Sequence, residues 1–188
     1  APESFNPALT EAFADAVKDL GVNHVVLFFE TDCPLLWPSK AAKGMPIDLM
    51  SQVNAIFAKR NIRVMALMGS QVKPQDPKTP WPTWFGETMA EAAQHGCAGV
   101  SVCADEFPQC GGGPDPKLYA ERLKAELGLD SSPKFAEDTE PYRRFKLFNY
   151  RQTGAFHRHV ADRVKKGHPD SVMISSWRVD PIALNTTG

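Results

Sequence analysis

Three carboxylates directly follow short apolar segments, a position from which strand-end acids can reach a substrate. Glu30 follows the run Val25 to Phe29, and Asp105 and Glu106 follow the run 97–104. Two carboxylates can cleave a glycosidic bond, because one protonates the leaving oxygen while the other attacks the sugar or activates water. Side-chain alternation turns Asp105 inward and Glu106 toward a neighbouring loop. Asp105 is therefore the favoured catalytic residue, with Glu106 as the second candidate.

The four tryptophans are candidates for sugar contact, because a flat apolar ring can stack on a sugar ring. Trp177 ends the last apolar segment, and Trp37, Trp81 and Trp84 lie in proline-rich segments. Together with Glu30 they form the predicted substrate-binding set. A structural interpretation competes with this one, because a strand-end acid can cap a helix and a tryptophan among prolines can anchor a loop.

Helices that alternate with strands must position these residues. Hydrophobic periodicity predicts helices over residues 6–20, 46–60, 84–95, 117–127 and 142–166, and strands over 22–30, 62–69, 97–104 and 171–177. Pro46 is expected in the first turn of the second helix. Short turns around Gly21, Asn61 and Gly96 join a helix directly to a strand. The long loops that carry the candidate residues are therefore expected on the opposite side of the sheet.

The alternation predicts a single α/β domain over residues 1–188 with a parallel sheet. At about 50 residues per unit, eight units would need about 400 residues, near the upper end for a (β/α)8 barrel. Two architectures remain open: part of a TIM barrel, covering about its second to fifth strands, or a small doubly wound open sheet. A helix as first element and little chain after the last strand favour the partial barrel.

Strand periodicity also predicts which side chains face the helices. In the first strand these are Val25, Leu27 and Phe29, which leaves Glu30 on the inner side. In the last strand the aliphatic set is expected to face the helices and the alternate set to face inward. The outward set is Val172, Ile174 and Ser176, and the inward set is Met173, Ser175 and Trp177.

Composition and motifs argue against a protein that binds nucleic acid, a cofactor or a metal ion, or that spans a membrane. The 21 basic and 22 acidic residues give a net charge of -1, and only Lys165-Lys166 stands out as basic. No apolar run reaches the roughly 18–20 residues of a membrane span. No Gly-x-Gly-x-x-Gly follows the first strand, and His157 and His159 stand two apart on a helix, a poor metal pair.

Cysteine usage bears on the cellular compartment. Cys33, Cys97, Cys103 and Cys110 form no CxxC pair and no zinc spacing, so free thiols are favoured. A Cys103–Cys110 bridge is the alternative in an exported protein. The start Ala-Pro-Glu has no signal peptide and suits a processed segment or a piece of a longer chain. The compartment stays open, with a secreted or periplasmic location favoured over a cytoplasmic one.

Several stretches resemble a known enzyme family. They are FADAVKDLGVNHVVLFF at 13–29, WPSK at 37–40, IDLM at 47–50, NIRVMA at 61–66, GCAGVSVCADEF at 96–107, and residues 142–177 with VMISSW at their end. They are similar to glycosyl hydrolases with (β/α)8 barrels that are related to the α-L-fucosidase and family 42 β-galactosidase groups. The likeness covers most of the chain.

The resemblance implies a glycosidase of carbohydrate metabolism. In such enzymes the carboxylate that ends the fourth strand is catalytic, as nucleophile in the fucosidase-like groups and as acid/base in the family 42 groups. It maps to Asp105 or Glu106. The second catalytic carboxylate lies on a later strand than those predicted here, so hydrolysis is expected of the complete barrel.

The expected partners are a carbohydrate substrate and either the remainder of the chain's own barrel or a second copy. Two other functions stay open: a non-catalytic carbohydrate-binding or scaffold domain, and another α/β enzyme that acts on a small metabolite.

Overall fold

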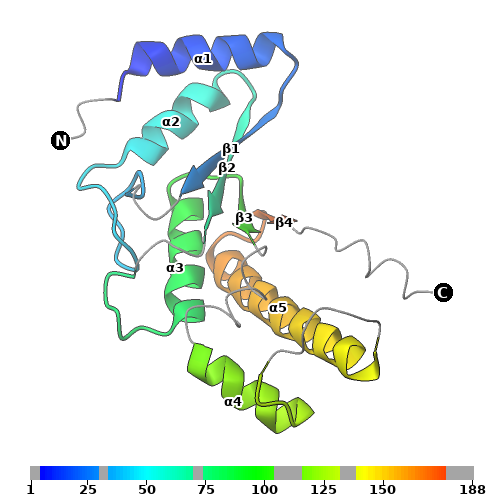
Figure 1. Cartoon of the computed structure of the whole chain (residues 1–188). Coiled ribbons are helices and arrows are strands. Elements are labelled where there is room, and N and C mark those ends of the chain that lie inside the picture. The colour runs from blue at the N-terminus through cyan, green and yellow to red at the C-terminus, as the bar shows by residue number, and fades with distance from the viewer. Residues whose placement is uncertain (1–4, 30–33, 70–73, 104–115, 132–138, 177–188) are drawn as a thin grey trace.

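The computed structural model describes residues 5–29, 34–69, 74–103, 116–131 and 139–176. Within these residues helices alternate with strands, as the periodicity predicts (Figure 1). In chain order the elements are α1 (Pro7–Asp19), β1 (His24–Phe29), α2 (Leu49–Ala58), β2 (Arg63–Met68), α3 (Trp81–Gln94), β3 (Gly99–Cys103), α4 (Pro116–Leu127), α5 (Glu140–Gly167) and β4 (Val172–Ser176).

The four strands form one sheet in the order β1-β2-β3-β4, and every neighbouring pair is parallel. Phe29 at the end of β1 lies beside Met68 of β2, which in turn lies beside Val102 of β3. The predicted parallel α/β fold is confirmed. Because every pair is parallel, all four strands end at the same edge of the sheet.

Each of the three short helix-to-strand turns contains a residue with positive φ. These are Gly21 at 75°, Asn61 at 59° and Gly96 at 92°. Glycine reaches this region without penalty, and asparagine tolerates it better than most residues do. The turns read from the sequence are therefore confirmed.

Two helices, α2 and α3, begin three residues away from their expected starts. Pro46 is not in the first turn of α2, because Asp48 is its N-cap and accepts a 2.9 Å hydrogen bond from the Ser51 amide. Helix α3 begins at Trp81, three residues before the predicted start, with Pro82 in its first turn. Proline is tolerated there, since first-turn amides lack intrahelical acceptors.

The main core lies between the helices and one face of the sheet. Val25, Leu27 and Phe29 of β1 pack there, as predicted, and the same apolar cluster includes residues of α1, α2, α3 and α5. We call the other side the open face; its described members are His24, Val26, Phe28, Arg63, Met65, Leu67, Gly99, Ser101, Val172 and Ile174. On this face the side chains of the central strands include buried ones, whereas those of the edge strands are half-exposed.

The predicted orientation of β4 is wrong. Met173 lies beside Val100 and packs against the main core, whereas Ile174 lies beside Ser101 and is half-exposed. Neighbours in a parallel register share a face, so Met173 faces the helices, and Val172 and Ile174 belong to the open face. The error arose because β-branched residues were expected to face the helices.

A smaller apolar cluster joins α4 to α5, at the far end of the molecule from α1 (Figure 1). Tyr119 and Leu123 of α4 pack against Phe148 of α5. The Tyr119 hydroxyl donates a 2.7 Å hydrogen bond to Asn149 Oδ1. This buried polar pair fixes how the two helices meet.

Candidate functional site

The edge at which the strands end is the place where a parallel α/β fold carries its site. Glu30 follows β1 directly, Asp105 and Glu106 follow β3 closely, and Trp177 follows β4 directly along the chain. These four predicted site residues lie outside the residues that the structure describes. The shared edge is described, and it lies where β1, β3 and β4 end.

Trp37 and Trp84 are core residues, with 1% and 3% of their surface exposed. The Trp37 ring meets Phe29 edge-on at 5.4 Å between centroids and stacks on His95 at 5.9 Å. Because Phe29 faces the helices, Trp37 lies in the helix layer and not at the open face. Neither ring offers a face to a sugar: Trp37 anchors its loop, and Trp84 packs in the core from helix α3. The backbone of Trp81 begins α3.

Glu91 of α3 holds the loop that follows β1. Its Oε2 accepts hydrogen bonds from Trp37 Nε1 at 3.2 Å and from Ser39 Oγ at 2.5 Å, and its Oε1 accepts one from the Lys40 amide at 2.9 Å. Ser39 Oγ also accepts the Ala42 amide at 2.9 Å. One carboxylate therefore satisfies three donors of the loop and fixes it against α3.

Sequence reasoning missed Glu91, because its partners lie more than fifty residues away along the chain. A glutamate near the end of an amphipathic helix resembles an ordinary solvated residue. The available signal was the Trp37-Pro-Ser-Lys segment itself, whose clustered donors need an acceptor when they are packed in a core.

A second polar cluster joins Asp48, Ser51 and His95. Asp48 Oδ2 accepts the Ser51 hydroxyl at 2.5 Å and lies 2.8 Å from His95 Nδ1. Partial burial tends to raise the pKa of Asp48, but hydrogen bonds from Ser51 and His95 outweigh it and lower that pKa below its usual value. Ser51 bonds the carboxylate instead of the imidazole, so the cluster lacks the nucleophile–base contact of a hydrolytic triad. It caps α2.

Cys97 is a structural residue. Its thiol is buried at the start of the segment that leads into β3, and Asn54 Nδ2 lies 3.9 Å from its sulfur. Burial raises the pKa of Cys97 to about 12. A thiol with so little thiolate at neutral pH is unreactive.

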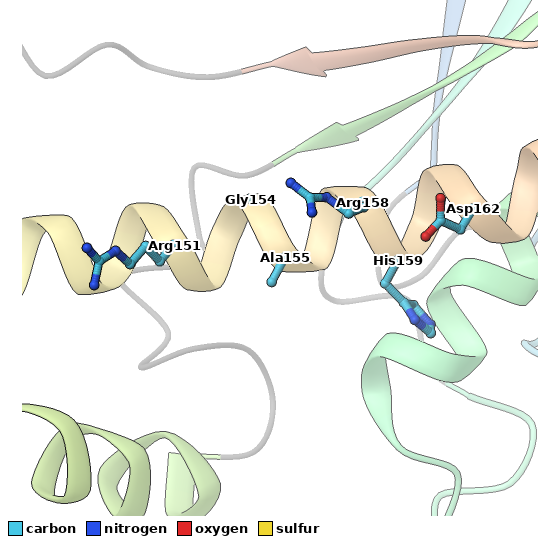
Figure 2. A pocket seen from close by; sticks show the side chains of 6 residues that line it. All are labelled: Arg151, Gly154, Ala155, Arg158, His159 and Asp162. Carbon is cyan, nitrogen blue, oxygen red and sulfur yellow. The ribbon is translucent and has the colours of Figure 1, made fainter.

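A groove of about 520 Å³ runs along α5 (Figure 2). The residues that line it are Arg151, Gly154, Ala155, Arg158, His159 and Asp162. Their helical positions place most of them opposite the buried Phe156 and Val160, so the groove opens mainly on the outer side of α5. The guanidinium groups of Arg151 and Arg158 can donate hydrogen bonds to an acceptor there.

Among the residues that the structure describes, no group of three or more His, Cys, Asp or Glu side chains could hold a metal ion. None of the described helices is both long and apolar enough to cross a membrane.

No family model matches the chain, and neither the curated proteins nor the solved structures contain a match to it.

Proposed function

We propose that this chain is a glycoside hydrolase-like domain that forms part of a (β/α)8 barrel and cleaves a glycosidic bond at the C-terminal edge of its strands. The observation that carries the proposal is the strand order β1-β2-β3-β4 in an all-parallel sheet with its main helical core on one face. A doubly wound sheet reverses its strand order and buries both faces under helices. In a (β/α)8 barrel the strands lie next to one another in sequence order, and the helices cover only the outer face of the sheet.

The spacing of the strands supports a carboxylate pair at this edge. Strands β1 and β3 lie on either side of β2, and neighbouring strands are about 4.8 Å apart, so their ends are about 10 Å apart. The two carboxyl groups of glycosidases are about 5–9.5 Å apart. Side chains of Glu30 after β1 and of Asp105 or Glu106 after β3 can span such a gap.

In the proposed reaction, one carboxylic acid of this pair protonates the glycosidic oxygen as the bond to the anomeric carbon breaks. The other carboxylate attacks that carbon or activates a water molecule for the attack. The resemblance assigns the catalytic strand-end role to Asp105 or Glu106. Trp81 remains a candidate for sugar contact, whereas the corrected orientation of β4 removes the alternation argument that turned Trp177 inward.

A purely carbohydrate-binding function has less support. It depends on a surface of tryptophan rings, and two of the four rings, Trp37 and Trp84, are buried in the core. A carboxylate pair does not depend on those rings.

The test compares three variants, Asp105→Asn, Glu106→Gln and Glu30→Gln, on a panel of chromogenic aryl glycosides that includes α-L-fucosides and β-galactosides. We expect Asp105→Asn to lower kcat by at least about a thousandfold with an unchanged melting temperature, because transition-state charge loses its stabilisation. A capping aspartate would behave oppositely and would lose about 1 kcal/mol of stability with little change in turnover. A protein with the complete barrel that is inactive on the whole panel, or activity that survives in both Asp105→Asn and Glu106→Gln, would refute the proposal.

A further inference from the structure

Helix α5 concentrates positive charge in a chain that is otherwise acidic. Its 28 residues include eight Lys and Arg against two acidic residues, Glu140 and Asp162, so the helix has a net charge of +6. The whole chain has a net charge of -1, so the remaining residues carry a net charge of -7. A helix face that is merely solvated usually alternates both signs of charge. The excess of one sign on α5 therefore indicates a ligand of the opposite sign.

Four of these cations form a line along one side of α5, which we call the cationic line. Its members Arg144, Arg151, Arg158 and Lys165 stand seven residues apart and are all exposed. Seven residues make almost two turns, so successive members lie on the same side, about 10 Å apart along the helix axis. This side is opposite the buried Phe156. The cations are spread out in the sequence, and the helix alone brings them into one line.

The cationic line has no hydrogen-bond or ion-pair partner among the residues that the structure describes. Two other arginines of α5 do have carboxylate partners. Arg163 pairs with Glu87 at 3.0 Å, and Arg143 lies 3.7 Å from Glu140. The guanidinium groups of the line are therefore available to a ligand, and each can bind a carboxylate or a sulfate through two parallel hydrogen bonds.

The groove of about 520 Å³ lies in the middle of the cationic line. Arg151 and Arg158 both line it, with Gly154 and Ala155 between them along the helix (Figure 2). A Cβ added at Gly154 would meet no atom within 4 Å, so the surface between the two arginines is open. Asp162 is the single carboxylate among the described lining residues. The groove can therefore take anionic groups at the guanidinium groups and an uncharged stretch of the same ligand between them.

The first half of the cationic line lies toward the edge at which the strands end. Helix α3 joins the start of β3 through a short turn, so the first residues of α3 lie on the side of the strand ends. Helix α5 runs beside α3 in the same direction, because the Phe156 ring lies 5.3 Å from that of Phe85 and Arg163 pairs with Glu87. The residues of α5 before these contacts extend past β3 and β4 on that side (Figure 1).

We infer that the cationic line binds an acidic polysaccharide, whose carboxylate or sulfate groups pair with Arg151 and Arg158 while a sugar ring lies over Gly154. The choice of a saccharide rests on the proposed function, whereas the need for an anionic ligand does not. It makes the substrate of that site an acidic glycan, which the line holds beside the strand ends.

Nucleic acid fits the cationic line less well. One strand carries a phosphate about every 3.4 Å, about three times as densely as the line carries cations. No described Phe, Tyr or Trp lines the groove, so bases would lack the rings on which they stack in proteins that bind single strands. In an acidic polysaccharide the charges stand on single or alternate sugar rings, and this sparser spacing suits the line.

The test measures the binding of a labelled heparin oligosaccharide and a labelled oligogalacturonate by fluorescence anisotropy, with a maltooligosaccharide as the neutral control. We expect the acidic oligosaccharides to bind, with an affinity that falls between about 50 and 200 mM salt. Binding of only one of them would support the inference and identify the anionic group as sulfate or carboxylate.

The variant that removes both guanidinium groups of the groove is Arg151→Gln with Arg158→Gln. It should weaken binding at least about tenfold, because two charge-assisted contacts are lost. The matched control is Lys18→Gln with Lys59→Gln, which removes the same charge from exposed residues of α1 and the end of α2. It should change the affinity by less than about twofold, because these charges are screened from a ligand on α5.

No binding of either acidic oligosaccharide at about 50 mM salt, or equal weakening by the two double variants, would overturn the inference. A single-stranded oligonucleotide of equal charge that binds more tightly than both oligosaccharides would overturn the choice of a polysaccharide. If the arginine double variant loses its circular dichroism spectrum, the two single variants replace it. Binding without hydrolysis would refute the proposed reaction alone, and hydrolysis of neutral glycosides without binding would refute this inference alone.

Discussion

Replacing Glu91 by alanine removes the acceptor for three donors of the loop after β1. The Trp37 indole N–H is buried, and losing its acceptor should cost about 1–3 kcal/mol. Ser39 is half-buried and the Lys40 residue is exposed, so these two donors can turn to water, and each should cost about 0.5–1 kcal/mol. We therefore expect Glu91→Ala to lower the free energy of unfolding by about 2–5 kcal/mol.

The assay is urea unfolding followed by far-ultraviolet circular dichroism, with Glu87→Ala as the matched control on the same helix. Glu87 is exposed and pairs with Arg163 at 3.0 Å, an interaction expected to contribute at most about 1 kcal/mol. Trp37→Phe keeps an aromatic ring and removes the indole N–H. Combined with Glu91→Ala in a double-mutant cycle, it should give a coupling energy of about 1 kcal/mol.

Two results would refute this reasoning. If Glu91→Ala destabilises the protein no more than Glu87→Ala does, Glu91 does not hold the loop. If the cycle with Trp37→Phe shows no coupling, the indole hydrogen bond contributes nothing.

Three further predictions concern the sheet, the cap of α2 and the buried thiol. Gly99→Ala should destabilise the protein by about 1–3 kcal/mol, because the added Cβ would overlap the Val172 carbonyl oxygen. Gly154→Ala on α5 should stabilise the protein by about 0.5–1 kcal/mol, because open space surrounds the added methyl group. Urea titrations measure both effects. The lowered pKa of Asp48 means that its carboxylate stabilises the fold above the unfolded pKa of about 3.9 and loses this effect as the pH falls through the folded value. Wild type should therefore be more stable than Asp48→Asn at pH 7, with a difference that shrinks below about pH 4; equal pH profiles would contradict this. Cys97 should resist alkylation at pH 8 in the native protein and react in urea, as peptide mapping would detect, because burial raises its pKa to about 12.

The parts of the fold that the sequence predicts well depend on neighbouring residues. Gly21 and Gly96 mark the helix-to-strand turns because their backbone conformation is a local property. The strands of the sheet are short apolar segments next to those turns, so their places and their parallel direction follow from the same pattern. The positions of the strand ends, after which the candidate carboxylates stand, follow from the same pattern.

The features that were missed depend on contacts between distant segments. The phase of β4 could not be read from Val172 to Ile174, because both alternate sets contain an apolar residue and only pairing with Val100 of β3 decides between them. The burial of Trp37 depends on the acceptor Glu91, which lies 54 residues further along the chain. No periodicity encodes such a pair.

The sequential strand order has a consequence for how the chain folds. The connection from β1 to β2 covers residues 30–62, whereas that from β3 to β4 covers residues 104–171, about twice as many. Closing a loop of twice the length adds only about 0.6 kcal/mol of chain entropy, but the longer connection must also order α4 and α5 before β4 can pair. The first three strands are therefore expected to assemble as a nucleus that β4 joins last. In the native protein β4 should open first, and its amide hydrogens should exchange with solvent faster than those of β2.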